Sequence, residues 1–291
     1  MYKLSCCSTV DLPKKEFESR GICYIPMTYE IDGQSYKDDL GESMSYDEFY
    51  TRIDNGALPT TSQINPDQYI KHFKKILDNG MDVLHITLSS ALSGMYQNAV
   101  LASKLLANDY PDRKIYVVDS LGASSGSGLL VLMASDMQLE GADIDTVHEW
   151  LENNKLRINH LFCTENLSHL YRGGRLSAAG ALVGSMLNIC PTMFVNEKGE
   201  LKVAQKIRGR KKALRQLCNT MEATADDGLN YSGYLLIAHS HAKDLADDLY
   251  AMVTEKFKHI KEIKICDIGC TIGSHVGSGT ACLFYVGKPR G

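Results

Sequence analysis

The chain has 291 residues, of which 44% are apolar, so it is long enough to bury two ordinary hydrophobic cores. Its formal net charge of −4 is spread without long acidic or basic blocks, which argues against a general role in binding nucleic acids or membrane surfaces. The N-terminus has no apolar stretch of signal-peptide length and no transmembrane-length apolar run occurs, so we expect a cytoplasmic protein without integral membrane association.

Short apolar runs that are typical of strands alternate with helical patterns along the chain. This order is typical of an α/β fold, with mostly parallel sheets and helices on both faces. We expect a doubly wound N-terminal α/β domain over residues 1–157 and a smaller C-terminal α/β domain over residues 158–291, because a helix gives way near residues 153–159 to a polar stretch before the next strand. The predicted strands cover residues 3–6, 83–88, 115–118, 161–163, 234–238 and 263–268.

Two helix starts are marked by capping signals. Asn65 precedes Pro66, and Gly80 follows the apolar face of the predicted helix, so both ends of this helix are indicated. Ser45 and Glu48 have the spacing of a capping box at the start of another helix.

Three polar segments stand where α/β proteins place their ligands, beyond the carboxyl ends of strands. The first is PTTSQINP at residues 59–66, in which the hydroxyl of Thr61 or a neighbour is able to donate to a ligand. A turn whose hydroxyls satisfy their own backbone is the alternative. The second is SSALSGMYQNA at residues 89–99, which leads into a predicted helix whose apolar residues include Ala99, Leu101, Ala102 and Leu105.

A helix N-terminus presents unpaired N–H groups, so Ser93 and Gly94 are candidates for holding an anion. Simple capping of that helix by Ser89 or Ser90 explains the same pattern equally well. In the third segment, at residues 269–286, His275 lies among glycines that let the backbone approach a ligand closely. A structural hydrogen bond is the alternative role for this histidine.

Several signatures of other functions are missing. The sequence contains no G-x-G-x-x-G fingerprint and no P-loop, so nucleotide chemistry is unsupported. It also contains no G-x-S-x-G elbow and no H-E-x-x-H, which weakens hydrolase and metalloprotease interpretations. Cys266 with Cys270 and the pair His239 and His241 lack the spacing of a zinc site, and we expect neither a metal nor a cofactor. The odd number of nine cysteines favours free thiols over a disulfide framework.

Taken together, six segments in register resemble the DegV family of fatty-acid-binding proteins over nearly the whole chain. The segments are STVDLP (8–13), PTTSQ (59–63), LSSALSGMYQNA (88–99), VDSLGASSGSG (118–128), GGRLS (173–177) and IGSHVGSG (272–279).

The resemblance implies a two-domain α/β fold with one long-chain fatty acid in a tunnel between strand ends. By matching motifs, it implies that Thr61, Ser93 and His275 hold the carboxylate. Some relatives deliver the acid to a separate kinase subunit, which makes an acyl phosphate for phospholipid synthesis. We therefore expect a non-catalytic carrier with no cofactor, whose ligand is a fatty acid and whose candidate protein partner is such a kinase.

Two departures from the family pattern bear on this expectation. Cys7 stands where the opening motif usually has an aspartate, and Ile189, Cys190 and Pro191 replace the usual I-K-P. Fatty-acid binding is therefore a safer expectation than delivery to a kinase.

Three further hypotheses concern individual residues. Arg172 and Arg175 flank two glycines, and we expect them near the ligand entrance on a partner surface. The main alternative function is an acyl hydrolase or transferase with Ser93 as nucleophile and His275 as base. A regulator acting through the basic stretch at residues 206–215 is a third possibility.

Overall fold

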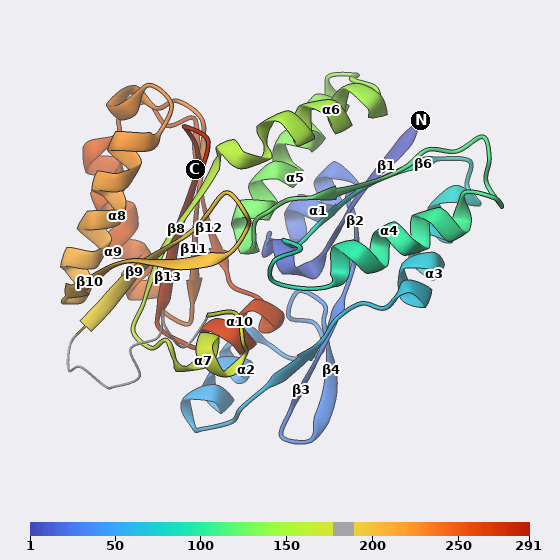
Figure 1. Cartoon of the computed structure of the whole chain (residues 1–291). Helices are drawn as coiled ribbons and strands as arrows, with labels where there is room; N and C mark the ends of the chain where they lie inside the picture. Colours follow the sequence, from blue (N-terminus) through green and yellow to red (C-terminus); the bar gives the residue numbers. More distant parts are fainter. Residues whose placement is uncertain (177–188) are drawn as a thin grey trace.

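The computed structural model describes residues 1–176 and 189–291, whose strands form three sheets (Figure 1). The strands are β1 (Tyr2–Cys7), β2 (Cys23–Ile25), β3 (Met27–Ile31), β4 (Gln34–Asp38), β5 (Thr60–Ser62), β6 (Asp82–Thr87), β7 (Ile115–Asp119), β8 (Ile158–Thr164), β9 (Ile189–Val195), β10 (Leu201–Arg208), β11 (Tyr234–Ser240), β12 (Glu262–Asp267) and β13 (Thr280–Val286). The sheet orders are β2-β1-β6-β7, β10-β9-β8-β13-β11-β12 and β4-β3-β5.

Helices separate most of these strands, as the predicted α/β class requires. The α-helices are α1 (Lys14–Arg20), α2 (Tyr46–Asp54), α3 (Pro66–Leu77), α4 (Met95–Leu106), α5 (Ser124–Leu139), α6 (Ile144–Asn154), α7 (Ser168–Arg172), α8 (Arg210–Thr224), α9 (Lys243–Lys256) and α10 (Cys270–Val276). Short 3-10 turns are η1 (Ser8–Val10), η2 (Lys155–Arg157) and η3 (Gly228–Asn230).

The four-stranded sheet is parallel throughout and has helices on both faces. Tyr69 and Phe73 of α3 and Met95 of α4 pack with Val83 on one face, whereas α5 and α6 cover the other. Strands buried on both faces read as continuous apolar runs, which is why β1, β6 and β7 were predictable from sequence, whereas the short β2 was not predicted.

The six-stranded sheet differs from the expected mostly parallel arrangement. Only β11 and β12 pair in parallel, and its other four neighbouring pairs are antiparallel. The reason is topological: β9 and β10 form a hairpin, and β13 inserts in the opposite direction between β8 and β11. Helices α8 and α9 cover one face of this sheet, and α5 packs on the other.

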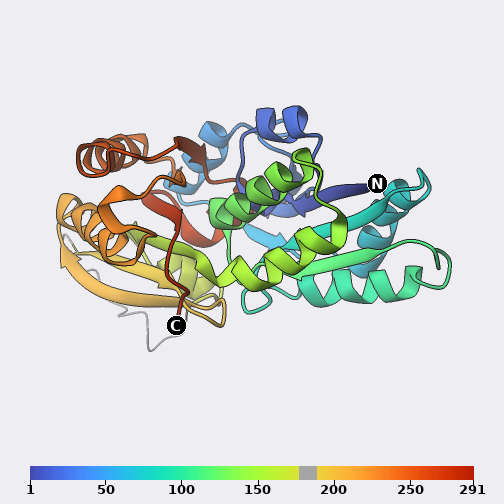
Figure 2. The ribbon, with the colours of Figure 1, turned by 90° about the horizontal axis from the view of Figure 1, so that it is seen from above.

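Helix α5 lies between the two larger sheets (Figures 1 and 2). Leu129 and Leu130 on this helix share one hydrophobic cluster with Leu84 of the first sheet and with Phe162 and Phe284 of the second. A helix that is apolar on all sides is stable only when it is buried on all sides. The predicted boundary between residues 157 and 158 stays a prediction, since one core spans both sheets.

The small antiparallel sheet β4-β3-β5 was not predicted from the sequence. Tyr29 and Ile31 on β3 pack with Phe49 and Tyr50 of α2 in a separate cluster. Strand β5 has only three residues, and its pairing with β3 places Thr61 opposite Tyr29. This sheet matters for function because it supports one wall of the candidate site.

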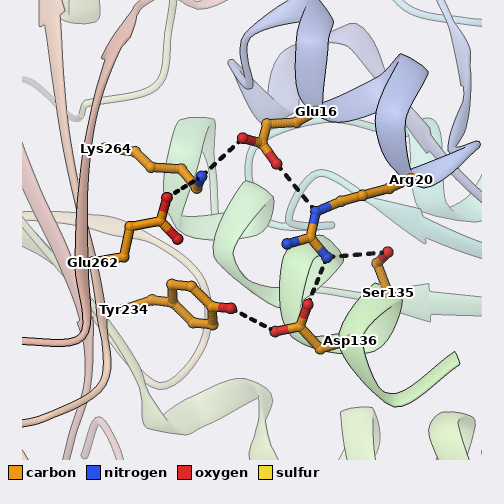
Figure 3. Close-up of polar contacts among 7 residues, drawn as sticks. All are labelled: Glu16, Arg20, Ser135, Asp136, Tyr234, Glu262 and Lys264. Carbon is orange, nitrogen blue, oxygen red and sulfur yellow. Dashed lines mark hydrogen bonds and ion pairs between the residues drawn. The ribbon is translucent and has the colours of Figure 1, made fainter. Parts of the chain in front are cut away.

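A polar network joins α1, α5 and the second sheet (Figure 3). The carboxylate of Glu16 accepts from Arg20 at 3.1 Å and from Lys264 at 2.8 Å, and Arg20 also pairs with Asp136 at 2.6 Å. Tyr234 on β11 donates to the second oxygen of Asp136 at 2.8 Å. Glu16, Arg20, Asp136 and Lys264 all keep less than a third of their side-chain surface exposed. The Glu16–Lys264 ion pair and the Tyr234–Asp136 hydrogen bond join the first half of the chain to the second, and partial burial makes this ion pair stronger than a fully exposed one.

The capping signals give two confirmed helix starts. Asn65 and Gln68 form a complete capping box before α3, and Ser45 accepts from the N–H of Glu48 before α2. Helix α4 begins later than predicted, with Gly94 as its N-cap. Ser89 does not cap it, since its hydroxyl accepts from the N–H of Ala91 at 3.2 Å, before the helix begins, and donates to the distant carbonyl of Gly199 at 2.9 Å.

The apolar residues of α4 differ in their burial. Ala99 and Ala102 are buried, whereas Leu101 and Leu105 are 47% and 54% exposed.

Within the described ranges, no helix combines the length and apolarity needed to cross a membrane.

Candidate ligand-binding site

A cavity of about 250 Å³ lies where the carboxyl ends of the first sheet approach α10 and one face of the second sheet. This volume is bounded by residues of the described ranges, 1–176 and 189–291, alone. Most wall side chains are apolar. Four polar ones belong to β5, the residue after it and α10, namely Thr61, Gln63, Thr271 and His275, whereas Ser124 and His160 lie on α5 and β8. The wall comprises Met27, Thr61, Gln63, Leu88, Leu92, Ser93, Ala123, Ser124, His160, Phe162, Leu170, Arg175, Val195, Leu201, Ile268, Thr271, Ile272, His275, Val276, Cys282 and Phe284.

The structure brings three of the predicted carboxylate-binding residues into this wall. Thr61 comes from β5, Ser93 from the turn before α4, and His275 from α10. His275 Nε2 and Thr61 Oγ1 are 2.9 Å apart, so the two side chains are hydrogen-bonded although 214 positions separate them. Convergence of hydroxyls and an imidazole at one end of an apolar cavity creates a site for a small polar group on an apolar ligand.

His275 does not lie in a glycine loop, as the sequence suggested, but in the last turn of α10. The glycine inside this helix is required by packing, since a Cβ atom on Gly273 would lie 2.5 Å from the hydroxyl of Tyr50. The two following glycines, Gly277 and Gly279, have positive φ angles and turn the chain into β13.

Burial keeps His275 neutral. Desolvation, followed by the charges of Arg175 and Arg172, lowers its pKa to about 4. Its Nδ1 is buried without a hydrogen-bond partner among the described residues, and a Cβ atom on Gly173 would lie 2.3 Å from that nitrogen. Neither ring nitrogen therefore bonds the hydroxyl of Ser93, as a catalytic serine–histidine pair would require.

Ser93 and Gly94 form the tight turn before α4. The Ser93 N–H donates to the Ser89 carbonyl at 3.2 Å, and Gly94 supplies the N-cap without a side-chain bond. Ser93 lines the cavity, whereas Gly94 lies behind Gln63, whose side chain forms that part of the wall.

Arg172 and Arg175, which were predicted near the ligand entrance, lie in different surroundings. Arg175 lines the cavity, donates from Nε to the Leu92 carbonyl at 3.1 Å and also bonds the Gly173 carbonyl. Burial lowers the pKa of its guanidinium. Arg172 is exposed, lies outside the wall and hydrogen-bonds His169. Ser177 of the same motif lies outside the described residues.

Sequence reasoning missed His160, which lies in the wall on β8. Its Nδ1 lies 2.9 Å from the Ile158 carbonyl and its Nε2 accepts from the Ala123 N–H at 3.4 Å. A carbonyl only accepts and an amide N–H only donates, so these contacts fix the proton on Nδ1. Burial lowers the pKa of His160, and both of its ring nitrogens are already hydrogen-bonded to the backbone.

Two buried carboxylates, also missed, hold the start of α10. Asp11 accepts from the Gly269 N–H at 3.0 Å, and Asp38 accepts from the N–H groups of Cys270 and Thr271 at 3.3 and 3.1 Å. Burial raises the pKa of both aspartates. Because α10 carries His275, these contacts fix the position of the imidazole.

The unusual Cys7 lies behind the wall, in the cluster that contains Met27 and Leu88. Its sulfur is 3.4 Å from the hydroxyl of Tyr69 and 3.7 Å from Nε2 of His85. Burial raises the pKa of this thiol to about 12, so it is neutral. A neutral thiol thus occupies the position at which the resemblance led us to expect an aspartate.

No group of three or more histidine, cysteine or acidic side chains suited to a metal ion occurs among residues 1–176 and 189–291. Cys266 and Cys270 are buried free thiols. His239 lies near Asp267, and His241 pairs with Asp54 at 3.2 Å.

The comparisons with known proteins decide the family. A family profile described as "Uncharacterised protein, DegV family" matches residues 7–288. The chain belongs to the DegV family. A DegV domain-containing protein from Clostridium perfringens is 37% identical over 283 residues, which are 97% of this chain and 96% of that protein. A DegV domain-containing protein from Caldanaerobacter subterraneus is 34% identical over 281 residues, 97% of each chain.

Solved structures of DegV family members share the fold over almost the whole chain. One from Thermotoga maritima, described as revealing a fatty acid binding function, is 30% identical with a TM-score of 0.85 and covers 98% of this chain and 99% of its own. One from Thermus thermophilus, described by its fatty acid binding, is 29% identical with a TM-score of 0.87 and the same coverage. The Fatty Acid Kinase B3 protein of Streptococcus pneumoniae, loaded with linoleic acid, is 23% identical with a TM-score of 0.85, which shows the shared fold alone.

Proposed function

We propose that this DegV family member binds one long-chain fatty acid in the cavity, with the carboxylate beside Thr61, Ser93 and His275. The observation that carries the proposal is the 2.9 Å contact between Thr61 and His275 at the polar end of an otherwise mostly apolar cavity. The fatty acids bound by the Thermotoga and Thermus relatives support it.

A neutral His275 supplies a donor chain for the carboxylate. With its single proton on Nε2, the imidazole donates to Thr61 Oγ1, and the Thr61 hydroxyl is then free to donate to the ligand. Arg175 adds a positive charge to the cavity wall, and its hydrogen bonds within the described chain go to backbone carbonyls. These groups offset the desolvation of a buried carboxylate, which would cost several kcal/mol if it were left unpaired.

The acyl chain supplies most of the affinity. Burying the roughly 14 methylenes of palmitate at about 0.8 kcal/mol each gives on the order of 11 kcal/mol before association costs. Apolar side chains such as Leu88, Phe162 and Ile272 provide the required wall.

We further propose that the protein is a cytoplasmic, non-catalytic carrier without a cofactor. All nine cysteines are free, which suits a reducing compartment. The Fatty Acid Kinase B3 likeness motivates a kinase as partner, and the exposed Arg172 is the better candidate for that surface because Arg175 faces the cavity. The division of the chain at residues 157 and 158 remains part of the proposal.

We expect the delipidated protein to bind palmitate one to one in a calorimetric titration, with a negative heat-capacity change from apolar burial. The same preparation should hydrolyse neither an acyl ester nor an acyl-CoA, because His275 bonds Thr61 and not Ser93. Turnover that disappears in Ser93→Ala would replace the carrier by the acyl hydrolase or transferase. Failure to bind palmitate would refute the proposed ligand class.

A further inference from the structure

Gln63 extends the polar end of the cavity beyond the three residues named so far. It follows β5 two positions after Thr61, and both side chains line the cavity. In an extended chain, residues two apart point to the same side, so we expect the Gln63 amide on the same side of the chain as the Thr61 hydroxyl.

The Gln63 amide also lies against the turn that carries Ser93. A Cβ atom added to Gly94 would come within 2.6 Å of Gln63 Oε1 and 3.6 Å of its Nε2. The nearest atoms belong to the far end of the flexible Gln63 side chain, so a methyl group at position 94 would displace the amide, although Gly94 itself has ordinary dihedrals, φ −72° and ψ 9°. The absent side chain leaves room for the amide.

The backbone that directly follows Gln63 is fixed by two contacts. Asn98 on α4 donates to the Ile64 carbonyl at 2.8 Å, and the capping box of Asn65 begins α3 directly afterwards. Ile64 is fully buried, whereas the Gln63 side chain is exposed at the rim. The chain therefore holds a neutral amide, with two N–H donors and one acceptor, between Thr61 and Ser93.

We propose that Gln63 is a specificity-determining residue whose amide donates a hydrogen bond to the ligand carboxylate and so favours an ionised acid over an uncharged lipid. This inference rests on the proposed function. A neutral amide is suited to carboxylate binding because its N–H groups stabilise the carboxylate while the ligand can still dissociate. A second positive charge beside Arg175 would hold the ligand more strongly.

The test compares myristate with 1-tetradecanol, which have the same chain length and differ in head-group charge. In Gln63→Glu, a carboxylate of the same shape faces the ligand, and we expect myristate affinity at pH 7.5 to fall about tenfold while 1-tetradecanol affinity stays within twofold. Gln63→Met removes the donor without adding charge, and we expect a loss of about threefold to tenfold for myristate alone.

Gly94→Ala provides an independent arm, because the new methyl displaces the Gln63 amide. We expect Gly94→Ala to weaken myristate binding several-fold in the wild-type background. In a Gln63→Ala background the loss should be less than twofold, because the amide that the methyl displaces is already absent and the two effects are then not additive. Thermal unfolding of each variant checks the fold, and Gln63→Met decides the question if Gln63→Glu does not fold.

Equal losses for myristate and 1-tetradecanol, or unchanged myristate affinity in both Gln63 variants, would overturn the assignment of Gln63. If the wild-type protein itself bound no myristate, the proposed function would fail instead, so the two failures are distinguishable.

Discussion

Replacing Ala123 by Phe is expected to lower the affinity for palmitate at least a hundredfold. Ala123 is a small residue of the cavity wall, and its extended backbone, φ −149° and ψ 162°, accommodates a larger side chain without strain. A phenyl ring directed into the cavity displaces several methylenes of the ligand. At about 0.8 kcal/mol each, four lost methylenes amount to roughly 3 kcal/mol, which corresponds to more than a hundredfold.

The effect of Ala123→Phe should depend on chain length. Octanoate fills less of the cavity, so we expect a much smaller loss for it than for palmitate in the same displacement assay. Ala251→Phe on the exposed face of α9 is the matched control and should bind palmitate like the wild type. Equal losses for both acids, or no loss for palmitate, would contradict placement of the acyl chain in this cavity.

Replacing His275 by Ala is expected to weaken palmitate binding by about tenfold to a hundredfold. The imidazole orients the Thr61 hydroxyl, and hydrogen bonds to a charged group contribute roughly 1.5 to 3 kcal/mol. Affinity measured by displacement of a fluorescent fatty acid checks this, with the exposed His259→Ala as control. Unchanged affinity in His275→Ala would remove the imidazole from the head-group site.

The same variant carries a pH signature. The folded pKa of His275, about 4, lies below the ordinary value near 6.5, so the unfolded chain binds this proton more tightly. The free energy of unfolding therefore decreases progressively as the pH falls from about 6.5 towards 4, because the unfolded chain takes up this proton first. Urea unfolding should show a smaller loss of stability between pH 7 and pH 5 for His275→Ala than for the wild type. An identical loss in both proteins would contradict a buried, neutral His275.

The sequence predicted those elements that are stabilised by contacts between residues close together in the chain or by a continuous apolar run. The start of α3 follows from Asn65, Pro66 and Gln68, which satisfy each other within one turn. The buried parallel strands β1 and β6 follow from their continuous apolar runs.

Elements decided by distant contacts were missed or misplaced. Strand β5 is too short for a pattern and exists through its pairing with β3. Residues 270–276 form a helix despite the glycine at position 273, because Asp11 and Asp38 hold its N-terminus from remote positions.

Only those site residues that belong to recognisable motifs were predicted from the sequence. Thr61, Ser93 and His275 were identified from resemblance, and the structure places all three in one wall. Gln63 was not singled out, since its role depends on contact with Gly94, which no spacing reveals. Arg175 was assigned to a partner surface, but its contact with the Leu92 carbonyl turns it into the cavity.

The most direct test of the account is native mass spectrometry of freshly purified protein, followed by lipid extraction. We predict one added mass per chain that matches a long-chain fatty acid, and its loss in Ala123→Phe. Protein that carries no lipid and takes up none when incubated with palmitate would contradict the account, as would a bound ligand of another chemical class.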